Sequence, residues 1–277
     1  CARCEESGRP AVVLCAGEAD ATRFAADCAV FGQSSEVFPS RDFVLRPVEG
    51  LNHEYEYRRL SVLGNLVGQR TRIVCAGVEA ALQYTMPRRE FCENTMTLKP
   101  DTEISVENLT KQLYAAGYHR RFQVEGPGQF SVRGGIVDIF APDMPKPCRL
   151  EFWGDCIDTI HTFDLSSQRR EDAVDKIYLS PAREVLFGCT EDAAALLRQA
   201  LEQATPKQRR ALEQALESDL KQLDAGTMPG TMDKYLGIRY EHPATLLEYP
   251  QEPIVFFNEP SAVREAARAL EYRFGEE

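Results

Sequence analysis

The 277-residue sequence contains no apolar run near the roughly 20 residues that a membrane-spanning helix requires. Its first six residues, CARCEE, are too polar for a secretory signal. We therefore expect a cytoplasmic protein with no membrane partner. Positive charge is also scarce, because 32 Lys and Arg stand against 43 Asp and Glu, for a net charge of −11. This balance weighs against non-specific phosphate binding by the whole chain, and it favours a protein partner or a small local basic patch.

Metal-binding and catalytic motifs are equally scarce. The nine cysteines are an odd number spread along the chain, and Cys15 and Cys75 lie in apolar strand-like segments, which is typical of reduced thiols in a cytosolic protein. Cys1 and Cys4 have the spacing of half a zinc site, but no second CxxC or histidine pair completes it. The four histidines have neither metal nor nucleophile spacing. We expect no catalytic residue, no metal and no cofactor in this chain.

The phosphate-binding motif of nucleotide-binding α/β domains, G-x-x-x-x-G-K-[ST], is missing from the sequence. The nearest string, at residues 64–71, is one residue short, lacks the lysine and follows a predicted helix, so we interpret it as a helix end and loop. Asn258-Glu259 follows a predicted strand, where an acidic pair would bind magnesium, but Asn258 is neutral. We interpret this degenerate Walker B position as a strand end that caps the helix starting at Pro260.

Hydrophobic periodicity divides the chain into three parts. Residues 1–95 alternate short apolar strands with helical patterns, which indicates an α/β domain. Residues 96–188 are mostly short strands separated by Gly and Pro turns, which predicts a mainly antiparallel β domain. Residues 189–277 form helices, then a strand at 254–257 and a last helix that would return to the first sheet. The predicted class is therefore α/β plus α+β, with the β domain inserted into a split α/β domain.

The stretch QFSVRGGIVDIF, residues 129–140, places two glycines inside a β pattern. Phe130 and Val132 face inward before the glycines, whereas after them Val137 and Ile139 are the inward candidates and Asp138 points outward. Strand side chains alternate with a period of two, so this change of parity requires an extra residue. We therefore predict a β-bulge at Gly134-Gly135.

A polar face is predicted on this β domain. Arg149, Glu151 and Trp153 alternate with the apolar Cys148, Leu150 and Phe152 on the next strand, and Arg133 belongs to the same face. Arg and Trp are enriched in protein-binding hot spots. The alternative is a solvated sheet face with a weak cross-strand Arg–Glu pair. Composition alone leaves both interpretations open.

The strings GPGQFSVRGGIVDIF and CRLEFWGDCIDTIHTFDLSSQRR resemble the inserted second domain of the bacterial excision-repair subunit UvrB. They resemble more strongly the corresponding N-terminal module of the transcription-repair coupling factor, Mfd. The similarity extends through SVENLTKQLYAAGYHRR and RRLSVLGNLVGQRTRIVCAGVEAALQ, and more weakly to EHPATLLEYPQEPIVFFNEP, so it covers most of the chain. The resemblance implies a degenerate helicase-like, P-loop-type α/β domain split by a UvrA-binding β domain.

In that family, the inserted domain binds the damage-recognition subunit UvrA through two arginines, an acidic residue and an aromatic residue. The matching positions here are Arg133, Arg149, Glu151 and Trp153. The resemblance thus implies a non-catalytic adaptor that recruits nucleotide excision repair to stalled RNA polymerase. It also implies that another domain of the parent protein masks this surface. DNA, RNA polymerase and ATP-dependent translocation would belong to other domains of the parent.

A second hypothesis is a fragment of an ATP-dependent DNA-handling enzyme of the UvrB type. That hypothesis requires a phosphate loop before Cys1, and we find no aromatic-rich DNA-clamping hairpin in the first domain. The family pattern places a strand and a degenerate phosphate loop before Cys1, and a polymerase-binding domain and a motor after Glu277. We therefore expect this chain to be a fragment of a longer protein.

Overall fold

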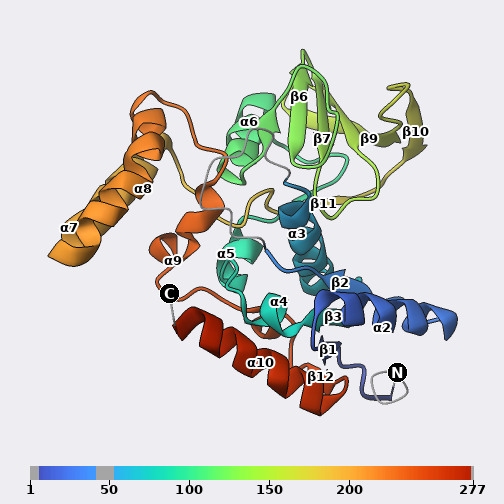
Figure 1. Cartoon of the computed structure of the whole chain (residues 1–277). Coiled ribbons are helices and arrows are strands. Elements are labelled where there is room, and N and C mark those ends of the chain that lie inside the picture. The colour runs from blue at the N-terminus through green and yellow to red at the C-terminus, as the bar shows by residue number, and fades with distance from the viewer. Residues whose placement is uncertain (1–5, 42–52, 276–277) are drawn as a thin grey trace.

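The computed structural model describes residues 6–41 and 53–275, so the Cys1–Cys4 spacing lies outside the described residues. A parallel sheet lies at one end of the molecule and a six-stranded sheet at the other, while a helical hairpin projects to one side (Figure 1). The predicted mixed α/β class with an antiparallel sheet is confirmed. The domain boundaries at residues 95 and 188 stay predictions.

The parallel sheet has the strand order β12-β1-β3-β2. Its strands are β1 (Ala11–Cys15), β2 (Glu36–Phe38), β3 (Ile73–Gly77) and β12 (Ile254–Phe257), and all neighbours run parallel. The returning strand therefore pairs with β1, with Ala11 opposite Ile254. The neighbouring strands β1 and β3 are buried almost throughout, as expected for a sheet covered on both faces.

Helices cover both faces of this sheet. Helix α2 (Glu18–Val30) packs on the face that carries Val13 and Cys75, whereas α3 (Glu54–Val67) packs on the face that carries Val12 and Val74. The remaining helices around the sheet are α4 (Val78–Leu82), α5 (Arg88–Glu93) and the C-terminal α10 (Pro260–Gly275). The string at residues 64–71 lies at the end of α3 and in the loop that follows it, as predicted.

The second sheet has the strand order β10-β9-β8-β7-β6-β5. Its strands are β5 (His119–Arg120), β6 (Gln129–Arg133), β7 (Ile136–Phe140), β8 (Cys148–Trp153), β9 (Cys156–Phe163) and β10 (Arg170–Ala173). The pairs from β6 to β10 are antiparallel, whereas β5 pairs with β6 in parallel. Helix α6 (Val106–Ala115), capped by the Ser105 hydroxyl, covers the apolar face with Leu109 and Leu113. Strands β4 (Met96–Leu98) and β11 (Ile177–Leu179) form a separate antiparallel pair.

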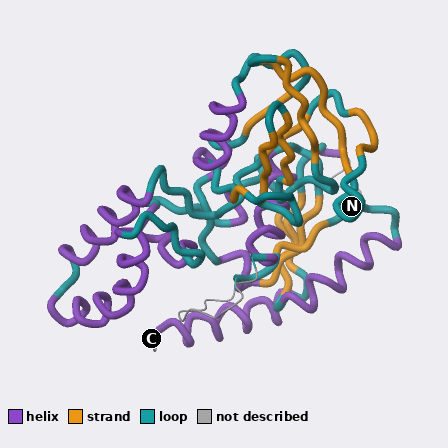
Figure 2. The backbone as a smooth tube through the Cα atoms, turned by 90° about the horizontal axis from the view of Figure 1, so that it is seen from above, coloured by secondary structure: helices purple, strands orange, loops and turns teal. Residues whose placement is uncertain are grey.

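Two long helices form the projecting hairpin, α7 (Thr190–Gln203) and α8 (Pro206–Asp224), which Figure 2 shows extending away from both sheets. A capping box between Thr205 and Gln208 starts α8. The short elements η1 (Met232–Tyr235), α9 (Leu236–Arg239) and η2 (Leu246–Glu248) then lead back to β12. In the described part of the chain, no helix combines the length and apolar character needed to span a bilayer.

The prediction of a β-bulge at Gly134-Gly135 is wrong. These two glycines are the central residues of a tight hairpin that joins β6 to β7, and Arg133 pairs with Ile136 across it. A two-residue turn produces the same change of parity, because Val132 then faces Val137 and both side chains lie on one face. Gly134 has a φ of +60°, as the first central residue of a primed turn requires. A register shift does occur in this sheet, but between β8 and β9 at Glu151/Phe152.

A buried ion cluster joins the α/β domain to the segment that leaves the second sheet. The Glu184 carboxylate accepts from Arg59 Nε at 2.6 Å and also pairs with Arg41. Arg59 is fully buried, donates to the Pro39 carbonyl at 2.9 Å and stacks over the Phe38 ring at 4.2 Å. A buried charge is tolerated only when it is paired and hydrogen-bonded in this way.

A second set of contacts lies beside this cluster. Arg183 Nη1 donates to Glu56 at 2.9 Å and to the His53 ring, and its Nη2 donates to His119 Nε2 at 2.6 Å. Partial desolvation, reinforced by the charges of Arg183, His53 and Arg121, lowers the pKa of His119 to about 4. The His119 ring is therefore a neutral acceptor at pH 7.

Replacing Gly134 by alanine should destabilise the fold by about 1–2 kcal/mol, because an L-residue pays that cost at positive φ. Nothing lies within 4 Å of the added Cβ, so the cost is conformational rather than steric. Gly237→Ala is the matched control, since Gly237 lies in α9 with an open Cβ position and no positive φ. Urea unfolding should show a lower midpoint for Gly134→Ala only; equal midpoints would contradict the turn geometry.

Acidification should weaken the fold through His119. Between pH 6.5 and about 4 the unfolded chain binds a proton at this ring while the folded chain does not, so stability falls as pH falls. His119→Gln removes that contribution, and its unfolding free energy should depend less on pH across this window. Urea titrations of both proteins at pH 7 and pH 5 measure the difference. Parallel pH profiles would show that His119 titrates normally.

Candidate functional site: the polar face of the six-stranded sheet

The face of the second sheet opposite α6 carries a row of polar side chains. The strand register aligns Ser131, Asp138, Arg149 and His161 across β6 to β9. Alternation places Glu151 and Trp153 further along β8 on the same face, while Leu150 points into the core under α6. The four residues predicted from the sequence therefore lie on one face.

The Asp138 carboxylate is the centre of this face. It is 1% exposed, and it accepts from Arg149 Nε at 2.6 Å and from Arg149 Nη2 at 2.9 Å. Arg133 Nη2 donates to the same carboxylate at 2.5 Å. One buried carboxylate on β7 thus fixes two guanidinium groups from the strands on either side of it, through a bidentate pair and a single bond.

Arg149 is held more tightly than Arg133. Its Nη1 donates to the Gln168 carbonyl at 3.2 Å, and its guanidinium lies 4.7 Å from the centre of the Phe163 ring. The bond to Asp138 raises the pKa of Arg149 above its usual value. The Arg149 side chain is only 16% exposed, whereas that of Arg133 is 39% exposed. Arg133 is therefore the arginine with more of its surface open to a partner.

Glu151 belongs to a second, exposed group of contacts. Its carboxylate accepts from Arg170 Nη1 at 3.3 Å and from the Thr159 hydroxyl at 3.3 Å. Arg170 also donates to the His161 ring, and desolvation together with the Arg170 charge lowers the pKa of His161. Because the Glu151 and Arg170 side chains remain partly in water, their pairing contributes little to stability and stays available for exchange with a partner's charges.

Among the described residues, no hydrogen bond or ring contact holds the Trp153 side chain as Asp138 holds the arginines. Trp153 is the last residue of β8, next to the Gly154 turn, and it is 85% exposed. A large aromatic side chain in water costs solvation free energy that burial against a partner would recover. The arrangement offers a partner one exposed tryptophan beside arginines and a carboxylate of fixed orientation.

Sequence reasoning placed Asp138 on this face but did not identify it as the buried carboxylate beneath both arginines. It also missed Arg170 and His161, which complete the contacts of Glu151. The outward position of Asp138 could have revealed this role. An acidic residue directly opposite an arginine on the next strand, here Arg149, forms a cross-strand pair. The correct hairpin register was needed to use that signal.

The carboxyl edge of the parallel sheet, where α/β proteins commonly bind ligands, differs from a phosphate site. Glu18 and Asp20 occupy the first turn of α2 directly after β1, and Glu79 occupies the first turn of α4 after β3. Asn258 is held in the sheet by its backbone N–H, which donates to the Leu14 carbonyl at 2.8 Å. Acidic residues at both helix starts repel phosphate. Within the described ranges, no three His, Cys, Asp or Glu residues are grouped to bind a metal.

Known proteins match both the polar-faced domain and the chain around it. Residues 96–185 match the family model of the UvrB interaction domain. The transcription-repair-coupling factor of Myxococcus xanthus is 31% identical over 278 residues, which cover 94% of this chain and 23% of that protein. Its Bacillus subtilis (strain 168) counterpart is 28% identical over 243 residues, covering 85% of this chain and 21% of that protein.

The chain is similar to the transcription-repair-coupling factors over most of its length. It spans only about a fifth of those relatives. The UvrB interaction domain match begins at β4 and ends at Val185, so it contains all six strands of the second sheet and the whole polar face.

Replacing Asp138 by asparagine should destabilise the domain by about 3 kcal/mol, because it leaves the two arginines without their buried counter-charge. Glu151→Gln is the control, since it breaks an exposed pair on the same face and should cost less than about 1 kcal/mol. Thermal and urea unfolding of both variants measure these differences. Equal, small effects would show that Asp138 does not organise the face.

Proposed function

We propose that this chain is a non-catalytic adaptor module that binds UvrA and thereby brings nucleotide excision repair to stalled RNA polymerase. The match to the UvrB interaction domain supports a role in the UvrA–UvrB repair system, and the coupling-factor relatives support a link to transcription. The observation that carries the proposal is the exposed Trp153 beside Arg133, Arg149 and Glu151, all inside the matched region.

The contacts on this face give each residue a separate role in binding. Trp153 supplies apolar area that a partner can bury, as tryptophan does in binding hot spots. Arg133 donates one hydrogen bond to Asp138 and presents the rest of its guanidinium to a partner's carboxylate or carbonyl groups. Asp138, which is itself held by Arg149, holds the Arg133 side chain in place, so less conformational entropy is lost on binding.

We propose that the remaining roles belong to other domains of a longer parent protein. We propose that the parent is an ATP-dependent DNA translocase, whose other domains bind DNA and RNA polymerase and cover this face until the motor engages DNA. We further propose a cytoplasmic location and no cofactor for the module. The acidic helix starts at the carboxyl edge of the parallel sheet favour this division over ATP use by this chain.

The test is calorimetric titration of the chain with purified UvrA. Trp153→Ala and Arg133→Ala should each weaken binding at least tenfold, which corresponds to about 1.4 kcal/mol. Both side chains are at least a third exposed, so the fold should survive their removal.

Two variants outside the face are matched controls. Phe31→Ala removes an aromatic ring that is 79% exposed at the end of α2. Arg198→Ala removes an arginine whose exposed side chain pairs with Asp224 on the helical hairpin. Both should bind UvrA within twofold of the unaltered chain. Loss of affinity in the controls as large as in the face variants would exclude this face as the binding site.

A further inference from the structure

The two most exposed large apolar side chains among the described residues both belong to the second domain. Phe122 is 91% exposed and Trp153 is 85% exposed. Phe122 lies in the loop between β5 and β6, outside the four positions that the sequence predicted. Single exposed apolar side chains are normal on a protein surface, so the position of Phe122 relative to Trp153 decides whether it has a role in binding.

Phe122 lies against the polar face of the sheet. The Ser131 hydroxyl donates to the Phe122 carbonyl at 2.8 Å, and Ser131 is the β6 member of the polar row. Trp153 is two strands away from Ser131 and four residues further along, on β8. Strand spacings of about 4.8 Å and a rise of about 3.3 Å per residue then separate these two positions by roughly 16 Å. Arg133, two residues beyond Ser131 on β6, lies between them.

The loop that carries Phe122 is fixed on both sides of this residue. Before it, the Arg121 backbone N–H donates to a carbonyl group of β6 at 2.8 Å. After it, Val124 is fully buried in a small apolar cluster that includes Phe163. The Arg149 guanidinium lies 4.7 Å from the centre of the same Phe163 ring, so the loop and the polar face share one support. Phe122 is therefore exposed on a backbone that is already in place.

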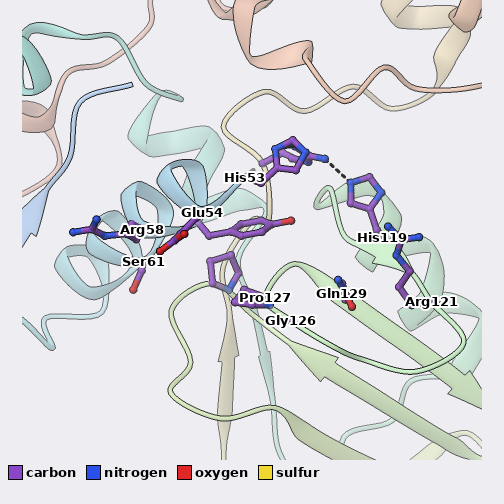
Figure 3. A pocket seen from close by; sticks show the side chains of 12 residues that line it. His53, Glu54, Arg58, Ser61, His119, Arg121, Gly126, Pro127 and Gln129 are labelled. Carbon is purple, nitrogen blue, oxygen red and sulfur yellow. Dashed lines mark hydrogen bonds between the residues drawn. The ribbon is translucent and has the colours of Figure 1, made fainter. Parts of the chain in front are cut away.

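The loop also packs against α3. Figure 3 shows Arg121 and Gly126-Pro127, which line a cavity of about 600 Å³ next to this helix. A Cβ atom on Gly128 would lie 2.6 Å from the Tyr57 hydroxyl of α3, and Gly128 has a φ of +74°, so only glycine permits this close approach. Phe122 is not part of the cavity wall, and neither α3 nor the sheet covers its ring.

We propose that Phe122 is a second aromatic anchor of the UvrA-binding face, an inference that rests on the proposed function. The UvrA surface that fits this face has two apolar pockets roughly 16 Å apart, with carboxylate or carbonyl acceptors for Arg133 between them. Two anchors at that separation fit within the roughly 800 Å² that each partner buries in a standard interface. Because the loop backbone is already fixed, burial of the Phe122 ring orders few additional groups.

Calorimetric titration of Phe122 variants with purified UvrA tests this proposal. Phe122→Ala should weaken binding at least fivefold, whereas Phe122→Leu keeps a large apolar side chain and should weaken it less than threefold. The urea unfolding midpoint of Phe122→Ala should match that of the unaltered chain, because the ring is exposed in the free protein. Phe31→Ala is the matched control, since it removes an equally exposed ring from α2, and its affinity should change less than twofold.

A double variant separates two independent anchors from one. Phe122 and Trp153 are too far apart to touch, so the losses of affinity in Phe122→Ala and Trp153→Ala should multiply when the two changes are combined. Weaker binding by Trp153→Ala together with unchanged binding by Phe122→Ala would overturn this proposal and leave the proposed function standing. Unchanged binding by both single variants would overturn the proposed function as well. A loss in Phe31→Ala as large as in Phe122→Ala would also overturn the role of Phe122.

Discussion

The buried Asp138 carboxylate is the interaction on which the proposed binding face depends. Two arginines that lie on strands on either side of β7 share this one acceptor, and the carboxylate is almost fully withdrawn from water. Isolated arginines on a sheet would sample many rotamers, and binding would then have to order them. Because Asp138 orders them in the free protein, the sheet presents a defined pattern of charge next to a tryptophan.

The rest of the fold supplies a rigid base for this pattern. Helix α6 packs Leu109 and Leu113 under the sheet, so the opposite face is left to carry polar groups. The Arg59–Glu184 pair then ties the exit of the β-rich region to α3 of the α/β domain. The same junction positions Arg183, which donates hydrogen bonds to Glu56 and to the His119 ring. The junction around Arg59 and Arg183 and the polar face around Asp138 are thus separate regions of the structure.

Much of the architecture could be predicted from the sequence, because it depends on local patterns. Short apolar runs, alternating or continuous, indicate the strands. Ser105 and Thr205 are residue types that favour the N-cap position, and each precedes a helix. The return of β12 to the first sheet also followed from the pattern of the last elements. The glycine pair was misinterpreted because a bulge and a two-residue hairpin cause the same change of parity, and only strand pairing distinguishes them.

Long-range side-chain contacts could not be predicted in the same way. Arg170 reaches Glu151 from β10, and Arg183 reaches His53 and His119 across the junction, so no sequence spacing reports these contacts. The sequence could identify which residue types were present on the face, but the structure was needed to show which of them are fixed and which are exposed.

Hydrogen–deuterium exchange of the chain with and without UvrA tests the central claim most directly. The account predicts slower exchange in peptides from β6 to β9, strongest around the Arg133 hairpin and the Trp153 turn, with α2 and the α7–α8 hairpin unchanged. Protection confined to those helices, with none on the sheet, would contradict it.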